Sequence, residues 1–292
     1  VYMDEMTVKA LAKINIGLDV TGVREDGYHL VRMIMQTVHM YDLVTVSKSA
    51  ETGISMTSNA KYLPTNEDNL CIKAAKLLAD EFSITDGTQI RLSKRIPVAA
   101  GMAGGSSDAA AVLYGMNRIH GLGLTKKELI ERGVKIGADV PYCLMRGTAL
   151  AEGIGEELTE LPQMMRCPVL IAKPPISVST KYVYEHLDAI EDPVHPDIDA
   201  MIADITAGDL HALGSHMGNI LEDVTIQKYP VIAQIKELMR QNGAVVSMMS
   251  GSGPTVFGFF DDEETLQRAK RAVEASGLAN RVQCTTIYNN RR

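Results

Sequence analysis

Hydrophobic and polar residues alternate along residues 8–20, VKALAKINIGLDV. Even positions are apolar throughout, whereas odd positions are mostly polar or charged. A period of two predicts a β-strand with one face in the core. Lys13 and Asn15 therefore project together from the opposite face, which is either solvated or turned toward a ligand.

Further strands are predicted downstream. Asp26-Gly27 is a turn signal, and Tyr28 and His29 follow it directly. Alternation resumes in DLVTVSKS (42–49), which completes a meander. The segment GTQIRLSKRIPVA (87–99) predicts another strand, and this strand leads into a glycine-rich loop.

A helical period begins after that loop. We expect Ser107 or Asp108 to cap the helix and Gly121 to end it. Its predicted apolar face carries Val112, Leu113, Met116 and Ile119.

A second helix is predicted after Thr125, which forms a capping-box pattern with Glu128. This helix should end around residues 133–137. Val140 precedes Pro141, and a residue before proline is disfavoured in helical geometry. We therefore expect Asp139 at a helix exit, on a short connection into the next strand.

The pattern starts afresh beyond residue 161. In order, we predict a strand (167–173), a helix (179–190), further helices (198–242), a strand (244–249), the turn SGSGP (250–254), a strand (255–260), a helix (262–276) and a strand (281–288). This β-α-β-β-α-β order is the ferredoxin-like arrangement with extra helices. We predict an α+β protein with two domains, residues 1–160 and 161–292.

Composition excludes several classes of function. The 292 residues are 46% hydrophobic and carry a net charge of −7, whereas a dedicated nucleic-acid binder usually shows a basic patch. No apolar run approaches the ~18 residues of a membrane span, and the N-terminus lacks an apolar signal core. We expect a cytoplasmic protein with neither nucleic acid nor membrane as partner. Val1 and Tyr2, ahead of Met3, are expected to be foreign to the natural sequence.

Cysteine spacing gives no metal or redox site. The four cysteines are Cys71, Cys143, Cys167 and Cys284, and no two of them form a C-x-x-C pair. Buried free thiols in a reducing cytosol explain them best. No residue of the chain is assigned as a metal ligand.

The glycine-rich loop is the strongest candidate for ligand binding. It comprises Pro97, Val98, Ala99, Ala100, Gly101, Met102, Ala103, Gly104, Gly105, Ser106 and Ser107. Glycines let the backbone approach a ligand closely, and the helix N-terminus that follows favours an anion. The loop has neither the Gly-Lys-Ser/Thr end of a P-loop nor the G-x-G-x-x-G of a dinucleotide fold. A tight turn without a ligand is the alternative.

Lys13 and Asp139 are candidates for phosphoryl-transfer chemistry. Transfer to a hydroxyl needs a group that accepts the hydroxyl proton, and a carboxylate can do so. A nearby lysine would keep that carboxylate ionised. Taken alone, Asp139 is better explained as an aspartate at a helix end or in a turn.

Three segments together resemble the three motifs of the GHMP kinases, the family of galactokinase, homoserine kinase, mevalonate kinase and phosphomevalonate kinase. They are VKALAKINIGLDV (8–20), PVAAGMAGGSSDAAA (97–111) and MSGSGPTVFG (249–258). The resemblance runs from about residue 7 to residue 288. It is greatest to the branch that acts on 4-diphosphocytidyl-2-C-methyl-D-erythritol, because of A-K-I-N (12–15), D-G-Y-H (26–29) and G-A-D-V-P (137–141).

The resemblance implies a fold and a reaction. The first domain would resemble ribosomal protein S5 domain 2, and the second would be ferredoxin-like. ATP, accompanied by Mg²⁺, would place its phosphates on the loop from Pro97 to Ser107. Asp139 would be the general base and Lys13 would polarise and orient. The 2-hydroxyl of the cytidine diphosphate methylerythritol would be phosphorylated.

The resemblance also implies the residues that bind this substrate. Asn15 would help to hold it, and Thr180 would line the same pocket. Tyr28 and His29 would receive the cytosine, with an aromatic face for stacking and a polar group for the base edge. Tyr184 would form the opposite wall.

One departure and several alternatives remain. Many members carry G-x-G-G-G-S-S in the second motif, whereas Met102 and Ala103 stand before Gly104 here. A methyl group at Ala103 would be tolerated unless the position needs a positive φ. The acceptor is otherwise homoserine, mevalonate or a sugar, or the chain is a catalytically silent nucleotide sensor. The oligomeric state stays open, with a homodimer as one option.

Overall fold

A computed structural model describes residues 4–290, so Val1 and Tyr2 lie outside the described residues. The chain forms two compact units. Within the described residues, unit 1 contains those up to Ala12, Met40–Val98 and Ala103–Met145. Unit 2 contains Lys13–His39, Ala99–Met102 and the residues from Arg146 onward. The units interleave along the chain, and the boundary at residue 160 stays a prediction about family domains.

Two long strands contribute to both units. Strand β1 (Glu5–Val23) and strand β2 (His29–Ser49) pair with each other. The alternation in residues 8–20 is confirmed as strand, and all the even positions from Val8 to Leu18 are buried. Asp26-Gly27 forms the turn between the strands, with φ of 85° at Gly27.

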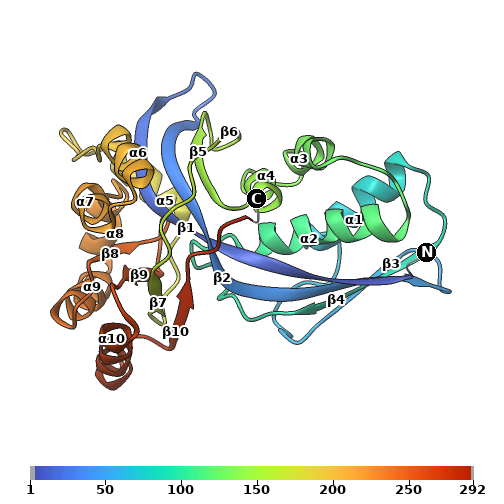
Figure 1. The fold of residues 1–292 in the computed structure, drawn as a ribbon. Coiled ribbons are helices and arrows are strands. Elements are labelled where there is room, and N and C mark those ends of the chain that lie inside the picture. Colours follow the sequence, from blue (N-terminus) through green and yellow to red (C-terminus); the bar gives the residue numbers. More distant parts are fainter. Residues whose placement is uncertain (1–3, 291–292) are drawn as a thin grey trace. The chain divides into compact units, whose positions relative to one another are not determined.

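Unit 1 is a layer of helices on a sheet. Its further elements are β3 (Ile54–Ser58), α1 (Leu70–Glu81), β4 (Gly87–Ser93), α2 (Gly104–Ile119), α3 (Lys126–Gly133) and α4 (Val140–Met145). Strand β4 pairs antiparallel with β2 and parallel with β3. The helices lie on one face of these strands (Figure 1). Gly115 of α2 faces Val46 of β2 so closely that a Cβ would lie 2.8 Å from Val46 Cγ2.

Local signals for the helices of unit 1 were partly right. The predicted apolar face of α2 is buried, and Thr125 forms the expected capping box with Glu128. The predicted cap of α2 is wrong. The helix begins at Gly104, its N-cap Ala103 makes no side-chain cap, and Ser107 and Asp108 lie inside it.

The prediction for Asp139 is also wrong. Asp139 directly precedes α4 instead of a strand, and Val140 is the first residue of that helix. Pro141 is tolerated because a proline in the first helical turn removes an N–H that has no intrahelical partner.

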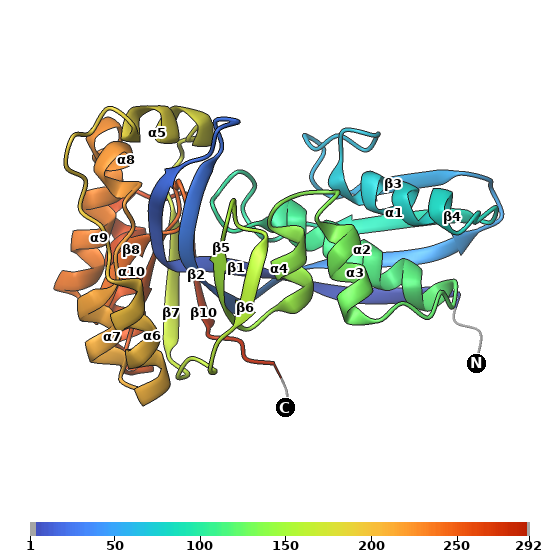
Figure 2. The ribbon, with the colours of Figure 1, turned by 90° about the horizontal axis from the view of Figure 1, so that it is seen from above.

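Unit 2 contains a four-stranded antiparallel sheet in the order β10-β7-β9-β8. Its strands are β7 (Pro168–Lys173), β8 (Val246–Met249), β9 (Val256–Phe259) and β10 (Arg281–Thr286). Its helices are α5 (Thr180–Leu187), α6 (Ile198–Ala207), α7 (Leu210–His216), α8 (Glu222–Lys228), α9 (Val231–Gln241) and α10 (Glu263–Ser276). The strand order and connections confirm the ferredoxin-like prediction. Helices α9 and α10 pack on the sheet (Figures 1 and 2).

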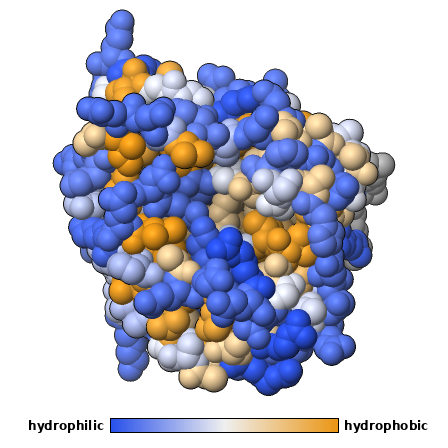
Figure 3. All heavy atoms as spheres, turned by 90° about the vertical axis from the view of Figure 1, so that its left-hand side faces the viewer, coloured by the Kyte–Doolittle hydropathy of each residue, from blue (hydrophilic) through white to orange (hydrophobic). Residues whose placement is uncertain are grey.

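Two short strands complete unit 2. Strand β5 (Thr148–Glu152) pairs with the first half of β2, and β6 (Glu157–Glu160) pairs with β5. The side on which α6–α10 lie is largely hydrophilic, with hydrophobic residues in separate groups (Figure 3). Across residues 4–290, none of the helices is long and apolar enough to cross a membrane.

Candidate functional site

Lys13 and Asn15 lie on the part of β1 that belongs to unit 2. Only 5% of Lys13 and 1% of Asn15 is exposed, so the solvated alternative for this strand face is wrong. Lys13 Nζ donates a hydrogen bond of 2.7 Å to Asn15 Oδ1. A buried ammonium needs polar partners. Asn15 supplies one of these partners.

Hydrogen bonds join the three sequence motifs within unit 2. The backbone N–H of Lys13 donates to the carbonyl of Met102 at 3.2 Å. The N–H of Asn15 donates to Ser250 Oγ at 3.2 Å, and this hydroxyl donates to the carbonyl of Gly101 at 2.9 Å. These bonds join residues 13–15 of β1, residues 101–102 of the glycine-rich loop and the SGSG turn (250–253). We call this hydrogen-bonded junction the motif crossing.

Gly101 is required by the close approach of two backbones. Its φ is 75°, and a Cβ there would lie 2.2 Å from the carbonyl oxygen of Ser250. Glycine is favoured where φ is positive and where a second backbone comes this near. The contact that demands glycine at this position is therefore with the third motif.

The SGSG turn is held from two sides. Asn219 Nδ2 donates to the carbonyls of Met249 and Gly251 at 2.9 and 2.8 Å. Thr180 Oγ1 lies 2.8 Å from Ser252 Oγ, so the predicted pocket residue contacts the third motif. Sequence reasoning missed Asn219, which falls in a run predicted only as helices. Ser250 was part of the quoted motif but had no assigned role.

The remaining part of the loop and its helix belong to unit 1. Ala103 has φ of 52° and Ala99, in unit 2, has φ of 50°, so two alanines occupy the left-handed region. Ala103 thus has the positive φ at which its methyl group was expected to cause strain. Ser107 Oγ donates to the carbonyl of Leu11 at 2.7 Å, which ties α2 to β1. A role for this serine in phosphate binding stays a prediction.

A buried charge cluster lies beneath the start of α2. Lys94 Nζ is 2.5 Å from Asp42 Oδ2 and 2.8 Å from Asp108 Oδ2. Burial raises the pKa of Asp108 well above its usual range, and the charge of Asp42 adds to this effect despite the attraction of Lys94. Burial acts to lower the pKa of Lys94, yet the two carboxylates together raise it. Sequence reasoning gave none of the three a chemical role.

Asp139 belongs to unit 1, whereas Lys13 belongs to unit 2. Asp139 is half-buried, and its carbonyl accepts a hydrogen bond of 3.0 Å from the N–H of Cys143. The pairing of Lys13 with Asp139 stays a prediction.

Two of the residues predicted to receive a pyrimidine are in ring contact in unit 2. The rings of His29 and Tyr184 have centroids 4.7 Å apart and are tilted by 45°. His29 Nε2 lies 2.8 Å from Asp188 Oδ1, a partner that the sequence did not indicate. Tyr28 is 58% exposed, and the guanidinium of Arg24 lies 5.6 Å from its ring centre.

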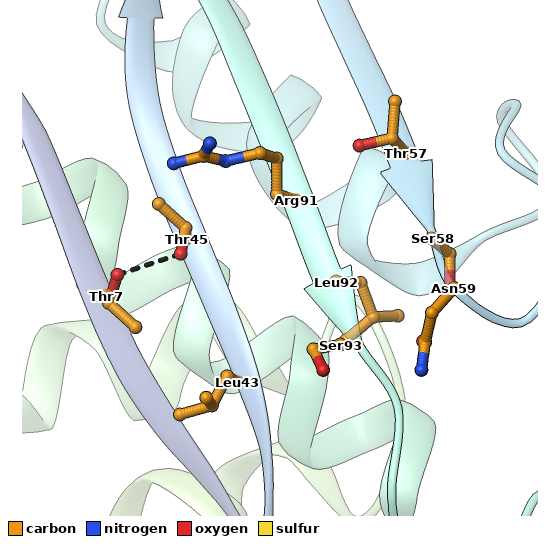
Figure 4. A pocket seen from close by; sticks show the side chains of 9 residues that line it. All are labelled: Thr7, Leu43, Thr45, Thr57, Ser58, Asn59, Arg91, Leu92 and Ser93. Carbon is orange, nitrogen blue, oxygen red and sulfur yellow. Dashed lines mark hydrogen bonds between the residues drawn. The ribbon is translucent and has the colours of Figure 1, made fainter.

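One cavity of unit 1 lies apart from the residues described so far. A cavity of about 440 Å³ lies on the strands of unit 1 and is lined by Thr7, Leu43, Thr45, Thr57, Ser58, Asn59, Arg91, Leu92 and Ser93 (Figure 4). None of these was predicted as a site residue. Within residues 4–290, no cluster of three His, Cys, Asp or Glu side chains could hold a metal ion.

Family models match both parts of the chain. The model of the GHMP kinases N terminal domain matches residues 69–147, and that of the GHMP kinases C terminal domain matches residues 201–279. A 4-diphosphocytidyl-2-C-methyl-D-erythritol kinase from Lachnospira eligens is 53% identical over 286 residues, covering 98% of this chain and 99% of that protein. The enzyme of that name from Clostridium perfringens (strain ATCC 13124) is 52% identical, over 98% of this chain and 99% of its own length.

Solved structures agree with this fold. A 4-(cytidine 5'-diphospho)-2C-methyl-D-erythritol kinase matches with a TM-score of 0.84 and 29% identity, over 98% of this chain and all of that chain. A homoserine kinase from Cytophaga hutchinsonii matches with a TM-score of 0.76 at 21% identity, over 98% of this chain and 94% of that chain. The second likeness concerns the fold alone.

Proposed function

Because the chain belongs to the GHMP kinase family, whose members are ATP-dependent kinases, we propose that it phosphorylates the 2-hydroxyl of 4-diphosphocytidyl-2-C-methyl-D-erythritol. This reaction belongs to the methylerythritol phosphate route of isoprenoid biosynthesis. The observation that carries the proposal is 53% identity, over 98% of the chain, to a kinase named for this substrate.

The loop is suited to hold the phosphates of ATP. No side chain caps α2, so the N–H groups of its first turn are available to an anion. ATP with Mg²⁺ supplies the phosphoryl group and neutralises its charge. We propose that Mg²⁺ would enter the site together with the nucleotide.

Asp139 is proposed as the general base and Lys13 as the charge that stabilises the reacting groups. A carboxylate can take the proton from the attacking hydroxyl as the new O–P bond forms. Lys13 is oriented by Asn15 and has little contact with water. A cation that is fixed before the reaction stabilises developing negative charge without reorganisation.

The cytosine is proposed to bind beside His29 and Tyr184. Their rings already lie in contact, and Tyr28 offers an exposed aromatic face nearby in sequence. Homoserine and mevalonate have no base to occupy such a surface. Thr180 and Asn15, both bonded to groups at the motif crossing, are proposed to line the rest of the substrate site.

The proposal is tested by ADP release with Mg²⁺ and ATP. The acceptors are 4-diphosphocytidyl-2-C-methyl-D-erythritol, homoserine and mevalonate. We expect release with the cytidine compound alone, and a fall in kcat of roughly 10² to 10⁴ in Asp139→Asn. Release with another alcohol would reject the proposed substrate. Binding of ATP without release from any acceptor would favour a silent sensor.

The setting of the enzyme is part of the proposal. We propose that it works in the cytoplasm with a small molecule as its partner, because the route it serves converts soluble metabolites. A homodimer stays a prediction, which the mass of the protein in solution would test.

A further inference from the structure

The glycine-rich loop has both of its ends attached to one buried cluster in unit 1. The cluster consists of Asp42 on β2, Lys94 after β4 and Asp108 on α2. Side-chain exposure is 0% for Asp42, 5% for Lys94 and 3% for Asp108. Such burial of three charged residues is uncommon unless each is paired.

The entry to the loop is fixed by Asp42. Its Oδ1 accepts hydrogen bonds from the backbone N–H of Arg95 and from that of Ile96, the latter at 2.8 Å. Asn59 holds the preceding residue, because its Oδ1 accepts from the N–H of Lys94 at 2.7 Å. The chain therefore reaches the loop with its last three residues held by side chains.

The exit from the loop is fixed by Asp108, which lies in the second turn of α2. Lys94 links the two ends, because its ammonium bonds both carboxylates. The same ammonium lies against the first residue of the helix. A Cβ on Gly104 would be 3.0 Å from Lys94 Nζ and 3.1 Å from Ile96 Cγ2. Gly104 is thus needed so that the lysine can pass beneath the helix start.

We propose that Asp42, Lys94 and Asp108 are positioning residues for ATP, that they hold the two ends of the glycine-rich loop at a fixed separation, and that Asp108 serves as a neutral acid. The inference rests on the proposed function in that the loop is taken to bind ATP. It does not depend on which alcohol is phosphorylated.

The neutral state of Asp108 follows from its surroundings. Two carboxylates share one ammonium, and like charges at such a site favour keeping one proton. Asp108 Oδ1 is buried and has no hydrogen-bond partner among the described residues, which is costly for a charged oxygen. Cys71 also faces the cluster, and burial raises the pKa of its thiol well above the usual value, so it adds no charge.

Equilibrium binding of ADP with Mg²⁺, measured by calorimetry, tests the positioning role. We expect Lys94→Met to weaken ADP binding at least tenfold, and the double variant Asp42→Asn/Lys94→Met, which leaves no unpaired charge at Asp42, to weaken it similarly. Arg132→Met is the matched control, because it breaks an ion pair with Glu81 in the same unit but away from the loop. It should lower the melting temperature and leave ADP affinity within twofold. Folded Lys94 variants that bind ADP as tightly as this control would overturn the positioning role.

Asp108→Asn tests the neutral acid. Asparagine has the shape of a protonated carboxyl, so ADP affinity should stay within threefold, whereas Asp108→Leu should lose at least tenfold. A tenfold loss in Asp108→Asn would overturn the neutral state. A wild-type chain that binds ADP without phosphorylating the cytidine compound would refute only the proposed acceptor.

The pH dependence of unfolding gives a second readout. Because the pKa of Asp108 is raised in the folded state, its contribution to stability is complete below the unfolded value of about 3.9 and is lost as the pH rises through the folded value. Asp108→Asn lacks this loss. Its melting temperature should therefore gain on that of the wild type as the pH rises, and a constant difference would count against a neutral Asp108.

Discussion

The motif crossing and the His29–Tyr184 patch both lie in unit 2, yet they are built differently. At the crossing, Lys13, Asn15 and Ser250 are almost fully buried, and most of the hydrogen bonds involve a backbone group. At the patch, side chains make the contacts and are less buried: 15% of the His29 side chain is exposed, and Tyr28, next to it in the chain, is 58% exposed. Buried hydrogen bonds to the backbone keep atoms in place, whereas partly exposed side chains can adjust to a ligand. We infer that the crossing serves the chemical step and the patch serves recognition.

Among changes within these two regions, Lys13→Met should have the largest effect. Loss of a preorganised charge typically lowers kcat by about 10²–10³, and here Asn15 also loses its buried partner. The KM for the cytidine substrate should change far less. Steady-state kinetics would show the division, with Lys9→Met, an exposed lysine four residues earlier on the same strand, as the control. A variant whose KM rises while kcat is kept would erase the contrast between the two regions.

Gly101→Ala should be the next most damaging change. A left-handed alanine costs roughly 1–2 kcal/mol, and the clash of its Cβ with Ser250 adds about 1–3 kcal/mol. Gly121→Ala separates the two causes, because Gly121 also has a positive φ but no atom within 4 Å of a Cβ. Denaturant unfolding and ADP binding should show the larger loss at Gly101. Equal losses at both glycines would mean that the close approach to Ser250 matters little.

Tyr184→Ala should produce a smaller change of a different kind. An aromatic contact is worth about 0.5–1.5 kcal/mol, so the KM for the cytidine substrate should rise roughly 2–10-fold. The KM for ATP and kcat should stay near the wild-type values. Tyr182→Ala is the control, because Tyr182 lies on the same helix but stacks on His186. A fall in kcat without a change in KM would place Tyr184 with the chemical step.

Ala103→Gly should have the smallest effect. Glycine would relieve the strain of the left-handed φ, which stabilises the folded state by about 1 kcal/mol. It would also raise the conformational entropy of the unfolded chain, which lowers stability by a similar amount. The free energy of unfolding should thus change by less than about 1 kcal/mol, and ADP affinity by less than threefold. Denaturant titration and calorimetry measure both, with Ala99→Gly as the partner variant. A gain in affinity above tenfold would show that the methyl group hinders the nucleotide.

Local patterns in the sequence determined most of the secondary structure. The alternation in β1, the capping box at Thr125 and the β-α-β-β-α-β order of unit 2 all depend on near neighbours in the chain. Two errors arose where local rules competed. Asp139 precedes a helix, α4, which can include Pro141 because the proline falls in its first turn. Helix α2 starts at Gly104, without the side-chain cap expected of Ser107 or Asp108.

Only the tertiary structure decided which polar residues are buried and with what they bond. Lys13 and Asn15 have side chains that are usually exposed to solvent, yet both are buried. The N–H of Asn15 bonds Ser250, which lies 235 residues later in the chain. Lys94 likewise bonds Asp42, which lies 52 residues away in the chain. Periodicity records which way a side chain points relative to its neighbours. It does not show which atoms bury that side chain, because those atoms belong to segments far away in the sequence, and their positions depend on the whole fold.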